Sequence, residues 1–156
     1  MCGTWLPRQR CFPTQSDVRQ ELGEIVVRTG GRALFEITDR VASWLREHDA
    51  HEGLLTLFVR HTSASLQVQE NADPDVLRDL EAFFARLVRD GDPLFAHTAE
   101  GPDDMSSHVR SALTQTSLSI PVTSGAMTLG TWQGIFLYEH RHARHERRIA
   151  IHYLGE

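Results

Sequence analysis

The 156-residue chain contains no lysine, since all 16 of its cationic side chains are arginines. Without lysine there is no Schiff-base chemistry, no pyridoxal phosphate anchored in the usual way and no phosphate-loop lysine. The 16 cations are outnumbered by 21 acidic side chains, which gives a net charge of −5. A basic surface for nucleic acid or for an anionic membrane is therefore not expected.

Cysteines and long apolar runs are also scarce. The two cysteines, Cys2 and Cys11, lie in the first dozen residues and are typical of free thiols, although a disulfide between them stays open. No apolar run approaches the roughly 20 residues of a membrane span. Met1–Pro13 lacks the continuous apolar core of a secretory signal. We therefore expect a cytoplasmic protein, and the length fits one domain.

The first 17 residues show no periodicity, so we expect an irregular N-terminal arm over 1–17 and a single domain over 18–156. Seven segments of the domain have strand character: Glu24–Thr29, Ala33–Ile37, Leu54–Val59, Leu66–Glu70, Ser117–Thr123, Met127–His140 and Arg148–Leu154. Leu54–Val59 is almost unbroken in its apolar character, which predicts a strand covered on both faces. Short connections between the strands favour a largely antiparallel sheet or sandwich.

Three helices complete the predicted α+β fold. The first helix follows Thr38, the second begins at Asp73-Pro74, and the third begins at Asp103-Asp104. The second has an apolar stripe that predicts a core helix, made of Val76, Leu77, Leu80, Phe83, Phe84, Leu87 and Val88. In the third helix, we expect the apolar positions to face inward, namely Met105, Val109, Ala112 and Leu113.

The segment His97–His108 holds two histidines and three carboxylates within twelve residues. Asp104 and His108 are four residues apart, so they share one helix face. His61 follows a buried strand, where a rigid scaffold presents functional groups. Three imidazoles, or two and a carboxylate, are the ligand set of a zinc-type site with an open position. We predict His61, His97 and His108 as ligands of zinc or magnesium, with Asp103 or Asp104 orienting or completing the site; a structural role stays open.

Two further groups carry chemistry-bearing side chains. Glu70 shares a strand face with Leu66 and Val68, so a partly buried general acid or base is one interpretation and a structural role is the other. The turn His140–Arg148 contains three histidines and four arginines. It is either a solvated loop or an anion-binding patch.

Several motifs, in their order along the chain, resemble the YjbQ family of secondary thiamine-phosphate synthases. They are His61-Thr62-Ser63-Ala64, Glu70-Asn71-Ala72-Asp73-Pro74, Glu100-Gly101-Pro102-Asp103-Asp104-Met105, His108, Leu129-Gly130-Thr131-Trp132-Gln133-Gly134 and the closing Gly155-Glu156. The resemblance covers roughly residues 24–156. It implies an α+β fold, a homotrimer whose sheets pack about the threefold axis, and a polar cleft near the subunit boundary.

The resemblance also implies an activity that joins hydroxymethylpyrimidine diphosphate to a thiazole phosphate with loss of pyrophosphate. Within it we assign Glu70, Asp103 and Asp104 to catalysis. We assign substrate binding to four further residues: Asn71, Thr131, Gln133 and Arg141. The alternatives are a metal-dependent hydrolase and a non-catalytic trimeric module that binds a small anion.

Overall fold

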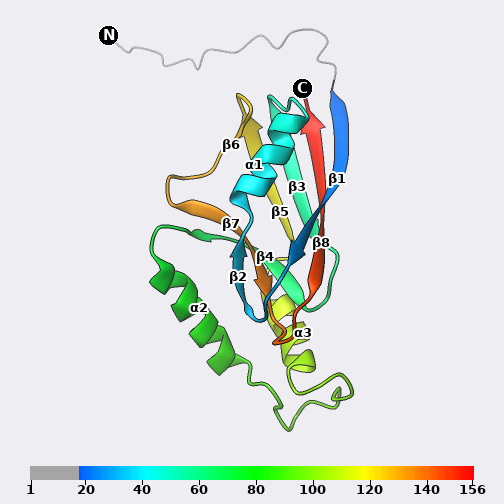
Figure 1. The fold of residues 1–156 in the computed structure, drawn as a ribbon, viewed down its shortest axis with the longest axis vertical. Coiled ribbons are helices and arrows are strands. Elements are labelled where there is room, and N and C mark those ends of the chain that lie inside the picture. The colour runs from blue at the N-terminus through cyan, green and yellow to red at the C-terminus, as the bar shows by residue number, and fades with distance from the viewer. Residues whose placement is uncertain (1–17) are drawn as a thin grey trace, which may run out of the picture.

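The computed structural model describes residues 18–156, which form two antiparallel sheets and three helices (Figure 1). The larger sheet has five strands in the order β1 (Arg19–Arg28), β8 (Glu146–Gly155), β3 (Gly53–Val59), β5 (Ser117–Thr123) and β6 (Ala126–Met127). The smaller sheet has three, in the order β2 (Ala33–Glu36), β7 (Gln133–Glu139) and β4 (Ala64–Glu70). The predicted α+β class is confirmed. The predicted arm over 1–17, with Cys2 and Cys11, lies outside the described residues.

One apolar core is shared by the two sheets and the first helix, α1 (Thr38–Glu47). Alternate side chains of the larger sheet point into this core, because successive residues of a strand face opposite sides. They include Ile25, Val27, Leu55, Leu57, Ile149, Ile151 and Tyr153. The smaller sheet adds Leu66, Ile135 and Leu137, and α1 adds Val41, Trp44 and Leu45. Within residues 18–156, no helix is long and apolar enough to cross a membrane.

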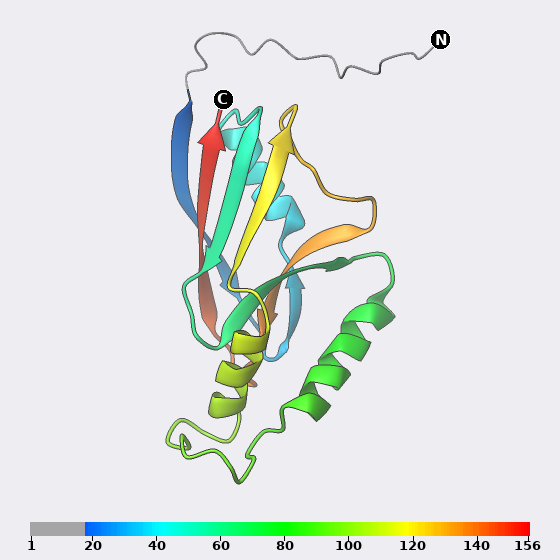
Figure 2. The same ribbon diagram turned by 180° about the vertical axis from the view of Figure 1, so that it is seen from behind.

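The larger sheet is covered on one face only, as Figure 2 shows from the bare side. Leu54–Val59 forms a strand as predicted, but it is not covered on both faces. Leu55, Leu57 and Val59 are buried, whereas Leu54 and Phe58 are 42% and 49% exposed. The continuous apolar run therefore predicts a second covering layer that a single chain does not supply.

The second helix, α2 (Pro74–Leu87), begins where the sequence predicts, because the Asp73 carboxylate accepts a hydrogen bond from the backbone N–H of Asp75 (2.9 Å). The prediction that its apolar stripe is core is met only in part: Val88, directly after the helix, is buried, and Val76, Leu77, Leu80 and Phe84 are half-buried. In the described part of the chain, α2 contributes no buried residue, and Phe83 and Leu87 are about half exposed. Both views show α2 standing away from the larger sheet (Figures 1 and 2). Periodicity specifies an amphipathic helix but not which surface covers it.

The predicted strand Met127–His140 is divided between the two sheets. Ala126–Met127 pairs with β5 in the larger sheet, and Gln133–Glu139 lies between β2 and β4 in the smaller one. The residues between them cross from one sheet to the other, so the motif around Trp132 is a connection rather than a strand interior.

The third helix, α3 (Asp104–Leu113), buries a polar face instead of the predicted apolar one. Ala112 and Leu113 are exposed, and the buried positions are Asp104, Ser106, Ser107, Arg110 and Ser111. The hydroxyl of Ser107 donates to the carbonyl oxygen of His140 (2.9 Å), and that of Ser111 donates to the carbonyl oxygen of Ala64 (3.1 Å). The small hydroxyls satisfy carbonyls at the strand ends, which keeps the buried polar groups paired.

Asp90 links the segment between α2 and α3 to the rest of the molecule. Its carboxylate accepts hydrogen bonds from Arg110 (2.9 Å), Arg32 (3.0 Å) and His142 (2.9 Å), and from the hydroxyl of Ser106. Burial alone would raise the pKa of Asp90. The hydrogen bonds from Ser106 and His142 and the charges of the two arginines outweigh burial and lower the pKa to about 2.

We expect Asp90→Asn to lower the free energy of unfolding by about 2 kcal/mol near pH 7, because the ionised carboxylate is stabilised only in the folded state. A depressed pKa contributes stability above the unfolded-state pKa and loses it as the pH falls through the folded-state pKa. The difference between wild type and variant in urea unfolding should therefore shrink from about pH 5 toward pH 2. A difference that does not change with pH over that range would contradict this role.

Candidate metal centre and adjoining cavity

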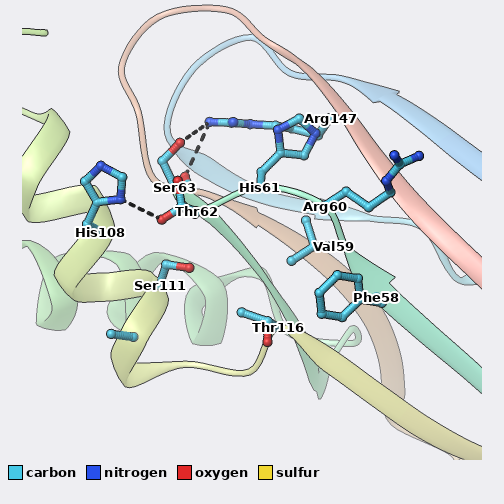
Figure 3. A pocket seen from close by; sticks show the side chains of 11 residues that line it. Phe58, Val59, Arg60, His61, Thr62, Ser63, His108, Ser111, Thr116 and Arg147 are labelled. Carbon is cyan, nitrogen blue, oxygen red and sulfur yellow. Dashed lines mark hydrogen bonds between the residues drawn. The ribbon is translucent and has the colours of Figure 1, made fainter.

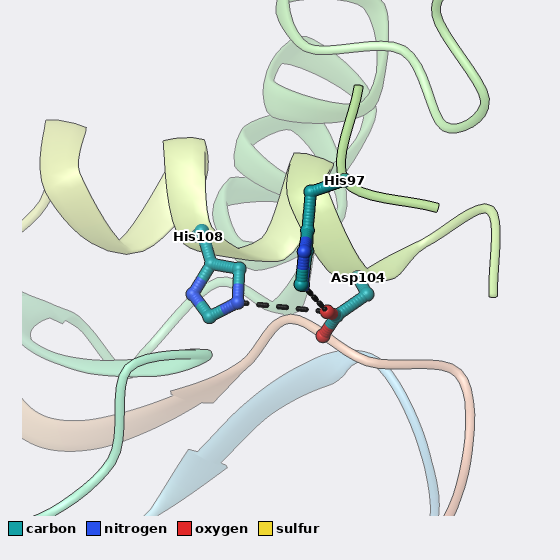
Figure 4. A group of neighbouring side chains, drawn as sticks. All are labelled: His97, Asp104 and His108. Carbon is teal, nitrogen blue, oxygen red and sulfur yellow. Dashed lines mark hydrogen bonds and ion pairs between the residues drawn. The ribbon is translucent and has the colours of Figure 1, made fainter. Parts of the chain in front are cut away.

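Three ligand-type side chains meet at the first turns of α3 (Figure 4). The Nε2 atom of His97 lies 2.7 Å from Oδ2 of Asp104, and Nε2 of His108 lies 3.6 Å from the same oxygen. One ligand atom from each residue lies within 4.8 Å of the others. The Asp104 carboxylate is buried, and both imidazoles are partly open to solvent. The structure thus brings together two of the predicted metal ligands and one predicted catalytic carboxylate.

Local sequence explains how these side chains meet. Gly101 has a φ angle of 107°, a conformation that favours glycine, and its carbonyl accepts the backbone N–H of Asp104 (3.3 Å). The turn folds the loop that carries His97 back onto the start of α3. Asp104 and His108 then lie one helical turn apart on the same face.

Hydrogen bonds fix the orientation of two of the three candidate ligands. The Nδ1–H of His108 donates to the carbonyl oxygen of Thr62 (3.0 Å), which leaves the lone pair of Nε2 facing Asp104. The other oxygen of Asp104 accepts a hydrogen bond from Arg141. Arg141, predicted to bind substrate, therefore positions a carboxylate of the cluster.

Asp103 supports Arg141 instead of joining the cluster. Its Oδ2 accepts hydrogen bonds from Nε of Arg141 (3.2 Å) and from the backbone N–H of His142 (2.8 Å). Burial alone would raise the pKa of Asp103, but these two hydrogen bonds and the charge of Arg141 outweigh it and lower the pKa.

The cluster fits a divalent ion of the zinc type. Zinc sits about 2.0–2.2 Å from nitrogen and oxygen ligands, so tetrahedral ligand atoms lie roughly 3.3 Å apart. The distances of 2.7 and 3.6 Å around Asp104 Oδ2 lie close to this spacing. Two imidazoles and one carboxylate leave a coordination position for water or substrate. An ion at this position would be held by His97, Asp104 and His108.

The structure does not bring His61 into this group. Its Nε2 accepts a hydrogen bond from the backbone N–H of Arg148 (2.8 Å), so the proton of the neutral ring is on Nδ1. Burial lowers the pKa of His61, the charge of Arg147 lowers it further, and Glu139 acts in the opposite direction. His61 is therefore a neutral hydrogen-bond donor instead of the predicted third imidazole ligand.

His61 and His108 instead lie on the walls of one cavity of about 820 Å³ (Figure 3). The end of β3 and the loop after it form one side, and α3 forms another. The lining residues are Phe58, Val59, Arg60, His61, Thr62, Ser63, His108, Ser111, Ala112, Thr116 and Arg147. The candidate metal centre adjoins this cavity through His108.

A buried ion pair holds Arg147 at the cavity wall. Its Nε and Nη2 atoms donate to the two oxygens of Glu139 (2.7 and 2.6 Å), and Glu139 has no exposed surface. Burial alone would raise the pKa of Glu139, but the hydrogen bonds from Arg147, Arg141 and Thr29 lower it. Nη2 of Arg147 also donates to the hydroxyl oxygen of Ser63 (3.1 Å).

Within one chain, four predicted site residues lie away from the cluster: Glu70, Asn71, Thr131 and Gln133. Ala64, at the start of β4, accepts a hydrogen bond from α3, whereas Glu70 ends the same strand about 20 Å further along. Asn71 donates to Glu36 (3.1 Å), and the side chain of Gln133 accepts from the backbone of Gly130 (2.8 Å). In a single chain, Glu70 is therefore too distant to act as acid or base at the metal centre.

The turn His140–Arg148 is exposed at His142–Arg144 and buried at His140 and Arg147, and three of its four arginines are paired with carboxylates. His140 is fully buried, and burial together with the charges of Arg110, Arg147 and Arg32 lowers its pKa to about 3. Arg141, Arg147 and Arg148 are engaged by Asp103 and Asp104, by Glu139, and by Glu24 and Glu146 respectively. The sequence alone does not show that these arginines are already paired. No periodicity in it indicates that Glu139 is the buried partner of Arg147.

We expect one zinc ion to bind per chain and His108→Ala to weaken binding by about 100-fold or more, because changes even to groups behind a ligand cost 10–100-fold. Asp104→Asn should weaken binding in the same direction. Calorimetric titration of the chelator-treated protein measures the effect, and His51→Ala, an exposed histidine outside the cluster, is the matched control. Equal affinity in His108→Ala and His51→Ala would rule the cluster out.

The sequence and fold both have known relatives. The model of the family "UPF0047 protein YjbQ-like" matches residues 23–156. A UPF0047 protein from Synechocystis sp. is 49% identical over 138 residues, which are 88% of this chain and 94% of that protein. UPF0047 protein YjbQ from Escherichia coli O157:H7 is 44% identical over 126 residues, covering 80% and 91% of the two chains.

Solved structures agree with the sequence relatives. A YbjQ-like protein of unknown function from Sulfolobus solfataricus P2 superimposes with a TM-score of 0.81 at 25% identity, over 89% of this chain and 99% of that one. A hypothetical protein from Aeropyrum pernix K1 gives a TM-score of 0.80 at 32% identity, over 87% and 99%. The predicted resemblance is confirmed: the chain belongs to the YjbQ (UPF0047) family.

Proposed function

We propose that the protein is a metal-dependent enzyme that acts on a small phosphorylated molecule, as the thiamine-phosphate synthase activity implied by the YjbQ resemblance requires. The observation that carries this proposal is the group His97, Asp104 and His108 on the edge of a cavity of about 820 Å³. The resemblance alone supports the specific synthase reaction.

The chain's own residues would divide the work. His97 and His108 would hold the ion through Nε2 and Asp104 would hold it through Oδ2, while Arg141 fixes the other carboxylate oxygen. A divalent ion in this position supplies Lewis acidity and neutralises charge on a departing diphosphate. Arg60 and Arg147 add positive charge on the cavity wall.

We expect the zinc- or magnesium-loaded protein to convert hydroxymethylpyrimidine diphosphate and thiazole phosphate to thiamine phosphate and pyrophosphate. The ligand variant His108→Ala should lose at least 100-fold in kcat/KM, which corresponds to about 2.7 kcal/mol of transition-state stabilisation. Chromatographic detection of thiamine phosphate measures the reaction, with His51→Ala as the control.

The same assay separates the rival functions. An open coordination position also suits a metal-dependent hydrolase, and release of phosphate without any transfer product would favour hydrolysis over synthesis. Binding of both substrates without turnover would favour a non-catalytic anion-binding module. Equal product formation by wild type and His108→Ala would contradict the proposed role of the metal centre.

We also propose that the protein forms the homotrimer implied by the resemblance, and the bare face of the larger sheet supports this. Three apolar side chains are exposed there at one end of the sheet: Leu22 (76%), Leu54 (42%) and Leu154 (41%). Leu54 and Leu154 are paired directly across β3 and β8. Exposed apolar side chains that lie side by side on a sheet are typical of a protein interface.

We expect the wild type to have a solution mass of about three times the chain mass of 17.7 kDa. Leu54→Glu should reduce the mass toward one chain, because it places a charge in the apolar interface. Leu94→Glu is the matched control, since Leu94 is 89% exposed in a loop outside the sheet. Light scattering after size exclusion measures the mass, and a trimer that survives Leu54→Glu would argue against this interface.

A further inference from the structure

Within the described chain, the cavity beside the metal centre is lined by hydrogen-bond donors and by no acidic side chain, although Arg60 and Arg147 are each paired with a carboxylate outside the lining, Glu24 and Glu139. None of the eleven described residues that line it is an aspartate or a glutamate. Four of them carry nitrogen donors: Arg60, His61, His108 and Arg147. The chain as a whole carries a net charge of −5, so a cavity lined in this way contrasts with the average surface. A site of this composition selects a negatively charged ligand group.

Three side chains of the lining, His61, Ser63 and Arg147, are fixed in place by other protein groups, and each keeps at least one proton for a ligand. His61 accepts from the backbone of Arg148 at Nε2, which leaves Nδ1–H. The Ser63 hydroxyl accepts from Arg147, which leaves its O–H. Glu139 and Ser63 occupy Nε and Nη2 of Arg147, and Nη1 has no hydrogen-bond partner among residues 18–156.

We propose that His61, Ser63 and Arg147 form a subsite for a phosphate group of the substrate, separate from the metal ligands. It rests on the proposed function only in that the phosphate belongs to the substrate. An arginine binds a planar carboxylate through two nitrogens on one edge of its guanidinium. Glu139 already occupies the Nε and Nη2 edge of Arg147, so this edge cannot bind a carboxylate ligand. Donors that converge from three separate side chains suit a tetrahedral anion better.

The side chains that hold this subsite are buried, so it is a preorganised site and not a cluster of mobile surface charges. Arg147 is 4% exposed, and the Glu139 behind it is fully buried, so the guanidinium is held without rotamer freedom. Donors that are fixed before the ligand arrives bind it without an ordering cost. Phe58 and Ala112, which line the same cavity, offer apolar surface to the organic part of the substrate.

The subsite also changes the role of His61. The sequence places it after a buried strand beside small hydroxyl residues, and the structure turns its Nε2 toward the backbone instead of the metal centre. A metal bound through His108 and a phosphate bound through His61 would then lie on walls of the same cavity. His61 is a substrate-binding residue in this account.

The test is calorimetric titration of inorganic phosphate into the full-length, metal-free protein. Wild type should bind phosphate with a dissociation constant of about 1 mM or tighter. Ser63→Ala and His61→Ala should each weaken binding about 10-fold or more, because each removes a hydrogen bond to a charged group. His61→Asn, whose amide nitrogen stands near the position of Nδ1, should retain more affinity than His61→Ala. Acetate should compete weakly.

The metal-ligand variant His97→Ala separates this proposal from the proposed function, because His97 belongs to the metal cluster but does not line the cavity. It should lose zinc binding while metal-free phosphate binding stays within about twofold of wild type. Phosphate binding without zinc binding would leave the subsite standing and remove the metal-dependent function. No phosphate binding, equal binding by wild type, Ser63→Ala and His61→Ala, or equal competition by acetate would overturn the subsite, and circular dichroism verifies that each variant is folded.

Discussion

The position of the candidate site depends on the hydrogen bonds that hold α3 against the ends of the strands. Ser111 bonds to the carbonyl of Ala64, Ser107 to that of His140, and His108 to that of Thr62. The three carbonyls lie at strand ends or next to them: Ala64 begins β4, Thr62 lies in the loop before it, and His140 follows β7. The same bonds place Asp104 and His108 beside the cavity.

Two buried arginines near α3 differ in how many of their guanidinium nitrogens have hydrogen-bond partners. Arg147 is matched by the fully buried Glu139 through two hydrogen bonds. Arg110 is 1% exposed and bonds to Asp90 and the carbonyl of Val88 through Nη2 alone, so its Nε and Nη1 have no partner within residues 18–156. Leaving a buried charge without its partner is costly, so both acidic residues stabilise the packing of α3 and the turn after β7.

Local patterns predicted local structure well. Asp73-Pro74 marked the start of α2, and the four-residue spacing of Asp104 and His108 placed them on one helix face. The closeness of His97 in the chain, with a glycine turn between, made their meeting predictable too. Contacts between distant segments were harder to predict: the stripe of α2 is only partly covered, and, within one chain, Glu70 lies at the far end of β4 and His61 turns toward Arg148. Periodicity and spacing carry no information on which surfaces meet across the fold.

The central claim is that His97, Asp104 and His108 bind a divalent ion at the edge of the cavity. A crystal structure of the zinc-soaked protein, with anomalous data at the zinc absorption edge, tests it most directly. We predict an anomalous peak about 2.0–2.2 Å from Nε2 of His97, Oδ2 of Asp104 and Nε2 of His108. A peak at His61 or Glu70 instead, or no peak at the cluster, would contradict the account.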